Sequence, residues 1–470
     1  MKLVYNVDAK PRDIGYGKLV VFALQQLLAI LAATIAVPAI IGNGMSQSAA
    51  LFGAGVGTLV YLAFTRFKSP VFLGSSFAFL GSMAVAFSGA YAYSNAGFTG
   101  LLLGAVFAGL VYVVIALITR FAGVKWITKL MPAVVVGPTV AIIGLSLAGN
   151  AVGDAVGHNF NMDLRSTLCL ICALVTLCTV MVCSVFGKKM MKMIPFILGI
   201  LAGYIVATIL TVIGIASDNE ALKIIDFSLF QNMKWVPDFT FIKAFKGFKD
   251  IDGAYVGTIA VAYIPVAFVV FAEHLADHKN ISSIIEKDLL EDPGLSNTLL
   301  GDGVGSIAGA FFGGCPNTTY GESIGCVAIS GNASVWTILV TACMAIVASF
   351  IAPFVTFLAT IPGCVMGGVC IALYGFIAVS GLKMVQKVDL GDNRNLFTVS
   401  VILITGIGGM ALTFGKVTIT AIATALILGI LTNLLLNRGK KADEDAPAEA
   451  AEEPAAEKAE EAEENKTDAE

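Results

Sequence analysis

The feature that most constrains the fold of this chain is a series of apolar runs long enough to cross a lipid bilayer. A transmembrane helix needs about 20 mainly apolar residues, and runs of that kind recur along most of the 470 residues. Only 13% of the residues are charged, whereas soluble domains carry about 25%. We therefore expect an all-α polytopic membrane protein. A β-barrel is excluded, because its spans would be alternating segments of about 10 residues.

The apolar runs predict fourteen transmembrane segments. They are residues 19–41, 49–67, 71–88, 98–120, 127–148, 164–186, 193–215, 254–276, 299–313, 320–330, 335–358, 365–381, 396–414 and 417–436. An even number places both termini on one side, and the Lys and Arg residues of the short loops favour the cytoplasm for that side. Residues 1–17 are polar and the first run is long enough to span, so we expect no cleavable signal peptide.

Two motifs of the first half recur in the second half. Residues 131–137 (MPAVVVG) match residues 361–367 (IPGCVMG), and residues 75–79 (SSFAF) match residues 318–322 (TTYGE). Each half contains seven predicted spans, and an odd number makes the second half enter the membrane in the opposite sense. The sequence therefore predicts two inverted repeats, an organisation found in many secondary transporters.

These repeats predict four regions. The first repeat covers residues 1–215, an extracellular connecting segment covers 216–252, and the second repeat covers 253–437. From residue 442 onward the chain has 13 acidic residues and two lysines, a net charge of −11, while the whole chain has −4. A segment so rich in Ala and Glu has no apolar face to bury, so we expect 438–470 to be a disordered cytoplasmic tail.

Spans 3 and 10 are interrupted by small and polar residues. The interruptions are Gly74-Ser-Ser-Phe77 and Asn317-Thr-Thr-Tyr320, at matching positions of the two halves. Non-helical backbone at membrane depth is tolerated only where it is buried in protein or lines a cavity. We expect two short extended segments that meet near the midplane, each followed by a half-helix whose N-terminal N–H groups face a ligand site.

Candidate carboxylates lie at the end of the eighth span. Glu273 and Asp277 are four residues apart, so they face one side of a helix. An acidic side chain at membrane depth is costly and marks a functional site by default. Asp277 can also be a solvated acid at the cytoplasmic edge. His274 and His278 have the spacing of metal ligands, but no third soft ligand is nearby and we expect no metal.

Four further residues are candidates for the site or its support. Glu322 follows Gly321, where a ligand can approach the backbone closely. Asp302, at the start of the ninth span, is as suited to holding helices together as to touching a ligand. Gln26 lies on the first span, and Tyr374 lies on the twelfth, where packing is the plainer interpretation.

Two acids on different half-helices within an inverted repeat indicate a secondary transporter. No Walker A motif is present, so we do not expect ATP to drive transport within this chain. Burial of a carboxyl group favours its neutral form, which makes buried acids natural proton carriers. We therefore expect proton coupling, no cofactor and no enzymatic activity, since the chain shows no nucleophile–base pair.

The motif Pro316-Asn-Thr-Thr-Tyr-Gly-Glu-Ser-Ile-Gly325 resembles the nucleobase/ascorbate transporter family, and within it the bacterial uracil permeases. Glu273-His274 and Gly74-Ser-Ser-Phe-Ala-Phe79 belong to the same resemblance, which covers about residues 5–436. It implies a core domain of spans 1–4 and 8–11 that moves against a gate domain of spans 5–7 and 12–14. It also implies a homodimer through the gate domains in the cytoplasmic membrane, with no nucleic-acid partner.

The resemblance also implies roles for single residues. Glu273 matches a carboxylate that binds the uracil ring and couples to protonation, and Glu322 matches a second ring-binding carboxylate. The other implied contacts are backbone N–H groups at Phe77 and Gly321, ring-flanking residues Ala33 and Tyr320, and gate residue Tyr374. Asp277, Asp302 and Gln26 are implied to support the site or its proton.

Two residues bear on the substrate in opposite directions. Purine-transporting relatives usually have Gln where this chain has Glu322, and carboxylates accept well from the two ring N–H groups of uracil. Asp277 stands where uracil permeases have His and purine members often have Asp. A further departure is Gln25-Gln26, where the family usually has Gln-His.

We therefore expect a uracil:proton symporter in the lipid bilayer. The alternatives are a xanthine or uric acid:proton symporter of the same family and, more distantly, an anion transporter or channel of the same fold. Two carboxylates in the site argue against an anion.

Overall fold

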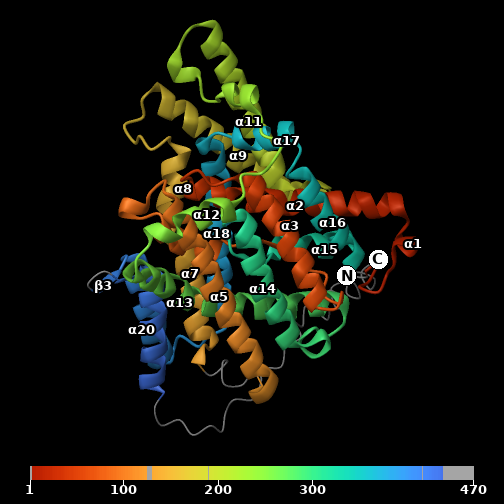
Figure 1. Ribbon diagram of the computed structural model, residues 1–470, viewed down its shortest axis with the longest axis vertical. Coiled ribbons are helices and arrows are strands. Elements are labelled where there is room, and N and C mark those ends of the chain that lie inside the picture. Colours follow the sequence, from red (N-terminus) through yellow and green to blue (C-terminus); the bar gives the residue numbers. More distant parts are fainter. Residues whose placement is uncertain (1–2, 124–129, 189, 415–416, 438–470) are drawn as a thin grey trace, which may run out of the picture.

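The computed structural model describes residues 3–123, 130–188, 190–414 and 417–437, and these are mostly helical (Figure 1). The helices and helical turns are α1 (Pro11–Ile14), α2 (Tyr16–Ile41), α3 (Gln47–Phe64), η1 (Phe77–Phe79), α4 (Leu80–Ala86), η2 (Gly89–Tyr91), α5 (Asn95–Ala122), α7 (Ala133–Ser146), α8 (Ala148–Ala155), α9 (Leu164–Phe186), α10 (Met190–Met193), α11 (Pro195–Ala216), η3 (Glu220–Leu222), η4 (Phe227–Asn232), α12 (Thr240–Gly247), η5 (Phe248–Asp250), α13 (Gly253–Ile285), η6 (Leu290–Gly294), α14 (Leu295–Gly313), α15 (Gly321–Ser330), α16 (Val335–Ala348), α17 (Ala352–Ala359), α18 (Gly363–Gln386), α19 (Asn393–Ile407) and α20 (Ala421–Leu436). The strands are β1 (Leu73–Ser75), β2 (Asn317–Thr319), β3 (Leu412–Phe414) and β4 (Val417–Ile419). The expected disordered tail lies outside the described residues.

Many of these helices have membrane length. Among the described residues, eight helices are long and apolar enough to span a bilayer, or nine if α16 and α17, which meet at 83°, form one bent span. Shorter apolar helices cover Phe77–Ala86, Asn393–Ile407 and Ala421–Leu436. The prediction of an all-α polytopic membrane protein is confirmed, whereas the number fourteen stays a prediction.

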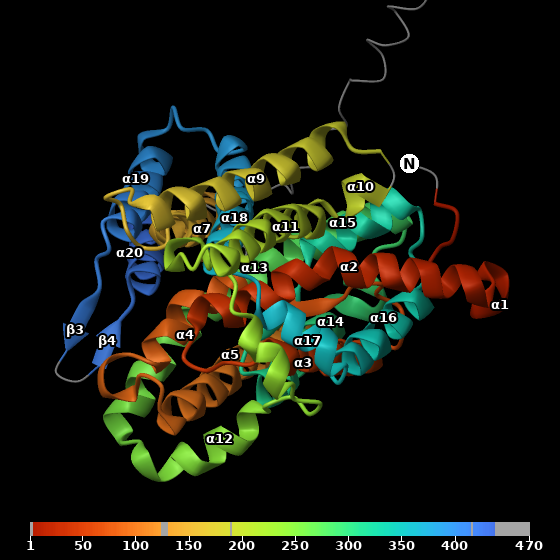
Figure 2. The same cartoon turned by 90° about the horizontal axis from the view of Figure 1, so that it is seen from above.

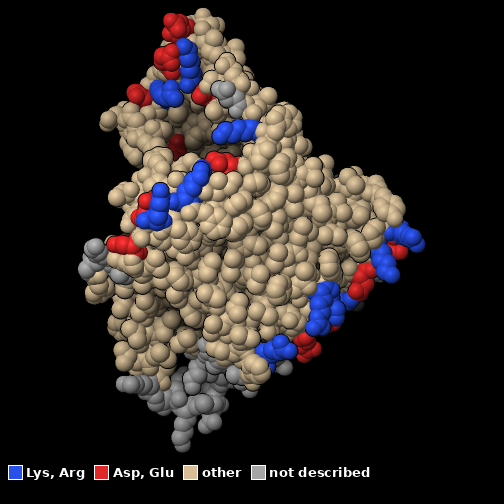
Figure 3. Space-filling view, in the orientation of Figure 1, with Lys and Arg blue, Asp and Glu red and all other residues tan. Residues whose placement is uncertain are grey.

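The surface agrees with a membrane setting. In the space-filling view, Lys, Arg, Asp and Glu gather toward the upper left and the lower right, and a broad uncharged surface separates them (Figure 3). Exposed apolar side chains such as Ile205, Val212 and Ile404 would be unfavourable in water. They are favourable where lipid chains cover them.

The two interrupted spans meet as a short antiparallel pair. β1 pairs with β2 in the register Leu73 with Thr319, Gly74 with Thr318 and Ser75 with Asn317. All six residues are buried. β1 leads into η1 and α4, and β2 leads into α15. The prediction of short extended segments in spans 3 and 10 is therefore confirmed.

The second repeated motif also recurs as structure. Pro132 and Pro362 are the N-caps of α7 and α18, and these two helices pack against each other. A proline suits the start of a helix because the first N–H groups of a helix have no intrahelical partner. The matched motifs thus mark the beginnings of two neighbouring helices from opposite halves of the chain.

The helices form two groups in the view from above (Figure 2). One group contains α3, α5, α14 and α16, and the other contains α7, α9, α11, α18 and α19, as their packing contacts also indicate. The assignment of these groups to the expected core and gate domains stays a prediction. The movement of one group against the other stays a prediction.

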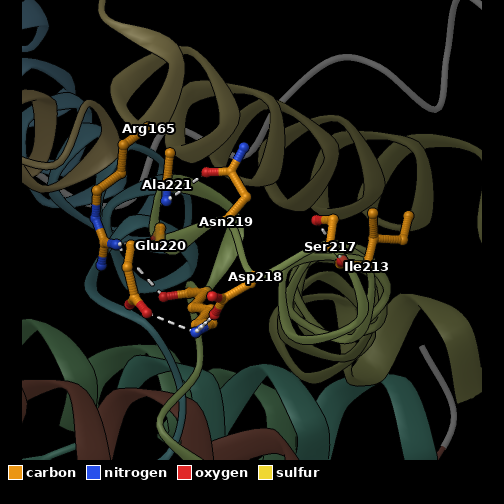
Figure 4. A network of polar contacts seen from close by, with 8 residues as sticks. Arg165, Ile213, Ser217, Asp218, Asn219, Glu220 and Ala221 are labelled. Atoms are coloured by element: carbon orange, nitrogen blue, oxygen red, sulfur yellow. Dashed lines mark hydrogen bonds and ion pairs between the residues drawn. The ribbon is translucent and has the colours of Figure 1, made fainter.

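The connecting segment after α11 is ordered by a polar network (Figure 4). Arg165, at the start of α9, donates from Nη1 to the carbonyls of Glu220 (3.1 Å) and Lys223 (3.4 Å). Lys223 Nζ lies 2.5 Å from Glu220 Oε1 and 3.5 Å from Asp218 Oδ1. These contacts, together with the Asn219 side chain that accepts from Ala221 N, fix the turn at the end of α11.

One region differs from the predicted spans. Residues of the thirteenth and fourteenth predicted spans form a hairpin, with Leu412 paired with Ile419 and Phe414 paired with Val417. The facing ends of the two predicted spans are apolar, but β-branched and aromatic residues are also typical of strands. Apolarity alone therefore did not distinguish the end of a span from a hairpin.

Close approach of α14 to α3 depends on glycine. A Cβ at Gly309 would lie 2.1 Å from Asn317 Nδ2, and a Cβ at Gly53 would lie 2.3 Å from the carbonyl oxygen of Gly309. Small residues allow helix backbones to approach in membranes. Asn317, on β2, donates to the Gly53 carbonyl at 3.1 Å, so this contact also holds the strand in place.

We predict that Gly309→Ala destabilises the protein, because overpacking costs about 1–3 kcal/mol. The thermal unfolding midpoint of detergent-purified protein should fall. Gly375→Ala is the matched control, since Gly375 also lies inside a helix but has no atom within 4 Å of an added Cβ. Equal midpoints for Gly309→Ala and the control would contradict the packing argument.

Candidate functional site

A cavity of about 520 Å³ is lined by residues from both halves of the chain. Its walls come from η1, β2, α13 and α15 on one side and from α7, α11 and α18 on the other. Cavities of about 300–1,000 Å³ are typical of small-molecule sites. The volume therefore suits a small ligand together with the water that surrounds it.

The antiparallel pair of β1 and β2 shapes one wall of this cavity. Tyr320 donates its hydroxyl to the Ser75 carbonyl at 2.7 Å, and its backbone N donates to Phe72 O at 3.2 Å. A Cβ at Gly74 would lie 2.3 Å from the Tyr320 ring, so only glycine fits there. These contacts fix the points at which η1 and α15 begin.

Two helix starts lie at the cavity wall. Phe77 is the first residue of η1 and Gly321 is the first residue of α15, and both line the cavity. The first N–H groups of a helix have no intrahelical partner and favour negative or electron-rich ligand atoms. Tyr320, between β2 and α15, also lines the cavity but is itself buried.

Three carboxylates line the same cavity. Glu273 and Asp277 come from one face of α13, and Glu322 comes from the first turn of α15. Asp277 Oδ2 accepts a hydrogen bond from Thr319 Oγ1 at 2.7 Å. Glu273 and Glu322 come from different elements of the same wall, so a ligand in the cavity can reach both carboxylates.

This arrangement suits a ligand that has both donors and acceptors. Carboxylates accept hydrogen bonds, while the N–H groups near Phe77 and Gly321 donate them. Lys192, from α10, is the only Lys or Arg among the described residues of the cavity wall. The wall is otherwise mostly apolar, as is usual for a site that binds a small organic molecule.

A second polar layer lies behind the carboxylates. His274 and Asp302 are almost completely buried, and His274 Nδ1 lies 2.7 Å from Asp302 Oδ2. Neither residue lines the cavity. Asp302 therefore contacts a helix neighbour, the arrangement expected of a residue that holds helices together.

Among the described residues, no group of three His, Cys, Asp or Glu side chains could hold a metal ion.

Ala33 and Tyr374, two residues expected to contact the ligand, lie outside the cavity wall. Ala33 is buried in α2 and Tyr374 is buried in α18. The Tyr374 ring meets the Phe77 ring edge-on, with 6.1 Å between centroids, so it contacts a residue of the wall. In this arrangement Tyr374 adjoins the site through Phe77.

Gln26, on α2, is hydrogen-bonded to α15. Its Nε2 donates to the backbone carbonyl of Ser323 at 3.1 Å and also contacts Ser323 Oγ. That hydroxyl in turn accepts from Phe72 N at 3.2 Å. One amide side chain thus joins α2 to α15 and, through the Ser323 hydroxyl, to the residue before β1.

Several residues of the cavity wall were not predicted. They are Ser184 and Lys192 near the ends of α9 and α10, Phe196 on α11, and Phe376 and Ser380 on α18. These residues lie in or beside ordinary apolar runs, where the sequence shows no break or buried charge. The proline motifs before α7 and α18 were the available signal for this wall, but they do not identify single side chains.

Comparisons with known proteins identify the family of this chain. The model of the Permease family matches residues 17–414. This chain belongs to that family. It is 39% identical over 450 residues to the "Uracil permease" of Bacillus caldolyticus, covering 94% of this chain and 97% of that protein. It is 37% identical to the "Uracil permease" of Bacillus subtilis (strain 168), covering 90% and 94%, and 32% identical to that of Escherichia coli (strain K12), covering 88% and 90%.

Solved structures share the fold. The transmembrane domain of a cyanobacterium bicarbonate transporter, BicA, is similar with a TM-score of 0.61 and 15% identity, covering 91% of this chain and 99% of that one. SLC26A9 is similar with a TM-score of 0.63 and 10% identity, covering 91% and 66%. The predicted resemblance to the nucleobase permeases is confirmed. The chain is a multi-pass membrane transporter and not an enzyme.

We predict that the cavity is open to water-soluble reagents. Ala276, one residue before Asp277, lines it and is exposed. Ala276→Cys should react with a charged maleimide in detergent-purified protein, in a background where the exposed Cys178 and Cys343 are replaced by Ser. Ala267→Cys is the control, because Ala267 lies on the same helix and is fully buried. Equal labelling of both sites, measured by mass spectrometry, would contradict the cavity.

Proposed function

We propose that this permease is a uracil:proton symporter that imports uracil across the cytoplasmic membrane. The observation that carries the proposal is the presence of Glu322 and Glu273 in one cavity with the backbone donors at Phe77 and Gly321. The names of the relatives from three bacterial species support the choice of substrate.

Uracil matches the chemistry of this wall. Its ring has two N–H donors and two carbonyl acceptors, which pair with two carboxylates and two groups of backbone N–H donors. Glu322 is important to the choice because a carboxylate can only accept when ionised, whereas an amide at this position would also donate. A pyrimidine that offers two ring N–H groups is therefore favoured over a purine that needs a donor there.

Proton coupling is the second part of the proposal. Glu273, Asp277 and Glu322 are ionisable groups in a cavity between membrane helices. Ionisable residues in such positions mark ion and proton pathways. We infer that Glu273 takes up the coupled proton, with Asp277 as its neighbour one turn along α13 and Asp302 as a supporting residue.

The cavity also suggests how transport proceeds. Its ligand-binding groups belong to the expected core domain, and its opposite wall belongs to the expected gate domain. The wall includes Lys192, Ser380 and Met384, which lie next to loops that we expect in the cytoplasm. We infer an inward-open conformation, with both termini cytoplasmic, a homodimer formed through the gate domains, and core-against-gate movement between states.

Asp277 favours an alternative substrate. A xanthine or uric acid:proton symporter of the same fold would also use Glu273 and the backbone donors. The folds of BicA and SLC26A9 keep an anion transporter as a more distant alternative. Three acidic residues in one cavity disfavour an anion, because their charges repel it.

Glu273→Gln and Glu322→Gln should each abolish or severely reduce uptake of labelled uracil. Each change replaces an acceptor of a charge-assisted hydrogen bond, and such bonds contribute about 1.5–3 kcal/mol. Uptake of labelled uracil by cells lacking their own permease measures the effect of each substitution. In the unchanged protein, excess unlabelled uracil should compete with labelled uracil for uptake, whereas excess xanthine should not. Glu291→Gln is the control, since Glu291 is exposed and lies outside the cavity wall. Full uptake by both site variants would reject the site, and displacement by xanthine would favour the purine alternative.

Uptake should also depend on the proton gradient. In membrane vesicles energised with an inward proton gradient, we expect a protonophore to reduce the initial rate of uracil uptake and to prevent accumulation above the outside concentration. A matched potassium ionophore, which leaves the pH gradient in place, is the control. Accumulation that is unchanged by the protonophore would point to a different coupling ion, and equilibration without accumulation would point to a facilitator.

A further inference from the structure

Helix α13 carries two polar faces with different surroundings. Glu273 and Asp277 line the cavity on one face. His274 and His278, one residue further along in each case, are fully buried on another face. Their rings stack at 4.0 Å between centroids. The proposed ligand contacts account for the two acids but leave the two histidines without a role.

Every ring nitrogen of the two histidines has a partner. His274 Nδ1 lies 2.7 Å from Asp302 Oδ2, and its Nε2 lies 3.1 Å from Thr298 Oγ1, both on α14. His278 Nδ1 lies 2.8 Å from the carbonyl oxygen of His274, so that nitrogen donates the hydrogen bond. His278 Nε2 lies 2.7 Å from the Tyr61 hydroxyl, on α3.

Helix α3 connects this contact to the other side of the ligand site. Tyr61 is fully buried, and its hydroxyl is also hydrogen-bonded to Ser69 Oγ at 2.7 Å. One turn earlier, Thr58 Oγ1 accepts from Leu73 N at 3.0 Å and lies 3.1 Å from Leu73 O. Leu73 begins β1, the strand that leads into η1. One helix therefore holds both α13 and β1.

These hydrogen bonds restrict how far α13 can rotate about its own axis. Apolar packing is non-directional and tolerates a small turn of a helix, whereas hydrogen bonds weaken steeply when misaligned. A carboxylate about 5–6 Å from the helix axis moves by about 2 Å when the helix turns by about 20°. Such a shift would separate Glu273 or Asp277 from a ligand that the η1 backbone holds in place.

We propose that Tyr61 and His278 are positioning residues for substrate recognition, a role that rests on the proposed uracil site. Neither residue lines the cavity. Their hydrogen bond fixes the rotation of α13 relative to β1. It thereby sets the spacing between the carboxylates, which accept from a ligand, and the backbone N–H groups of η1, which donate to it.

Substitutions at the two residues separate this role from a general contribution to folding. Tyr61→Phe removes only the hydroxyl that contacts His278. His278→Asn keeps a nitrogen in place of Nδ1 but has no group at Nε2, whereas His278→Gln reaches the Nε2 position. We expect Tyr61→Phe and His278→Asn to raise the KM for uracil roughly fivefold to thirtyfold, with a smaller change in the maximal rate per folded transporter. His278→Gln should keep the KM of the unchanged protein to within about twofold.

The double variant Tyr61→Phe/His278→Asn provides a stricter test. Its KM should be no higher than that of the worse single variant, because both changes remove the same hydrogen bond. Tyr263→Phe is the matched control: Tyr263 is fully buried on α13, and its hydroxyl has no hydrogen-bond partner among the described residues. The amount of folded transporter is measured for each variant by size-exclusion chromatography.

The outcomes are distinct. A rise in KM for Tyr61→Phe and His278→Asn, with His278→Gln and Tyr263→Phe unchanged, supports the proposal. An unchanged KM in Tyr61→Phe and His278→Asn overturns it, even if less folded protein is obtained. An equal rise in Tyr263→Phe or additive effects in the double variant also overturn it. If the unchanged protein takes up no uracil, the proposed substrate fails instead.

Discussion

Backbone N–H and C=O groups inside a membrane protein need partners within the protein, and the pairing of β1 with β2 meets this need where two spans lose their helical structure. The rest of the site depends on that pair. It lets η1 and α15 begin in the interior, at residues that line a cavity. It also places Glu322 in the first turn of α15, where the positive end of the helix favours a carboxylate. Without the pair, the backbone at these breaks would be unsatisfied.

A layer of buried hydrogen bonds surrounds this pair. Gln26 joins α2 to α15 through Ser323, Thr58 joins α3 to β1, and Asn317 joins β2 to α3. Each of these side chains contacts a backbone group of another element, so each one satisfies a polar atom and specifies a position at once. An apolar core would allow the helices to slide or turn. Here the elements that line the cavity are held by directional contacts between residues that do not line it.

The sequence predicted the residues that are costly at membrane depth. Glu273 and Glu322 stood out because charge is rare inside apolar runs, and β1 and β2 stood out because small polar residues interrupt spans at matched positions. Lys192 and Phe196 were not predicted, since a residue near the end of an ordinary span gives no local signal that it faces a cavity. The contact of Tyr61 with His278 joins residues more than 200 positions apart, and it depends on the rotation of two helices that hydrophobicity does not define. The residues of β3 and β4 lie within predicted helical spans, because apolar residues occur both in membrane helices and in strands.

The register of β1 with β2 also bears on how the protein is made. Leu73 pairs with Thr319, so the two strands come from opposite halves of the chain. At about 5–20 residues per second, a ribosome adds the residues between them in on the order of 10–50 s. During that time the polar backbone of β1 has reached the membrane but its partner has not been synthesised. Until the second half is synthesised, β1 therefore lacks its strand partner, and the cavity, which residues of both halves line, is incomplete.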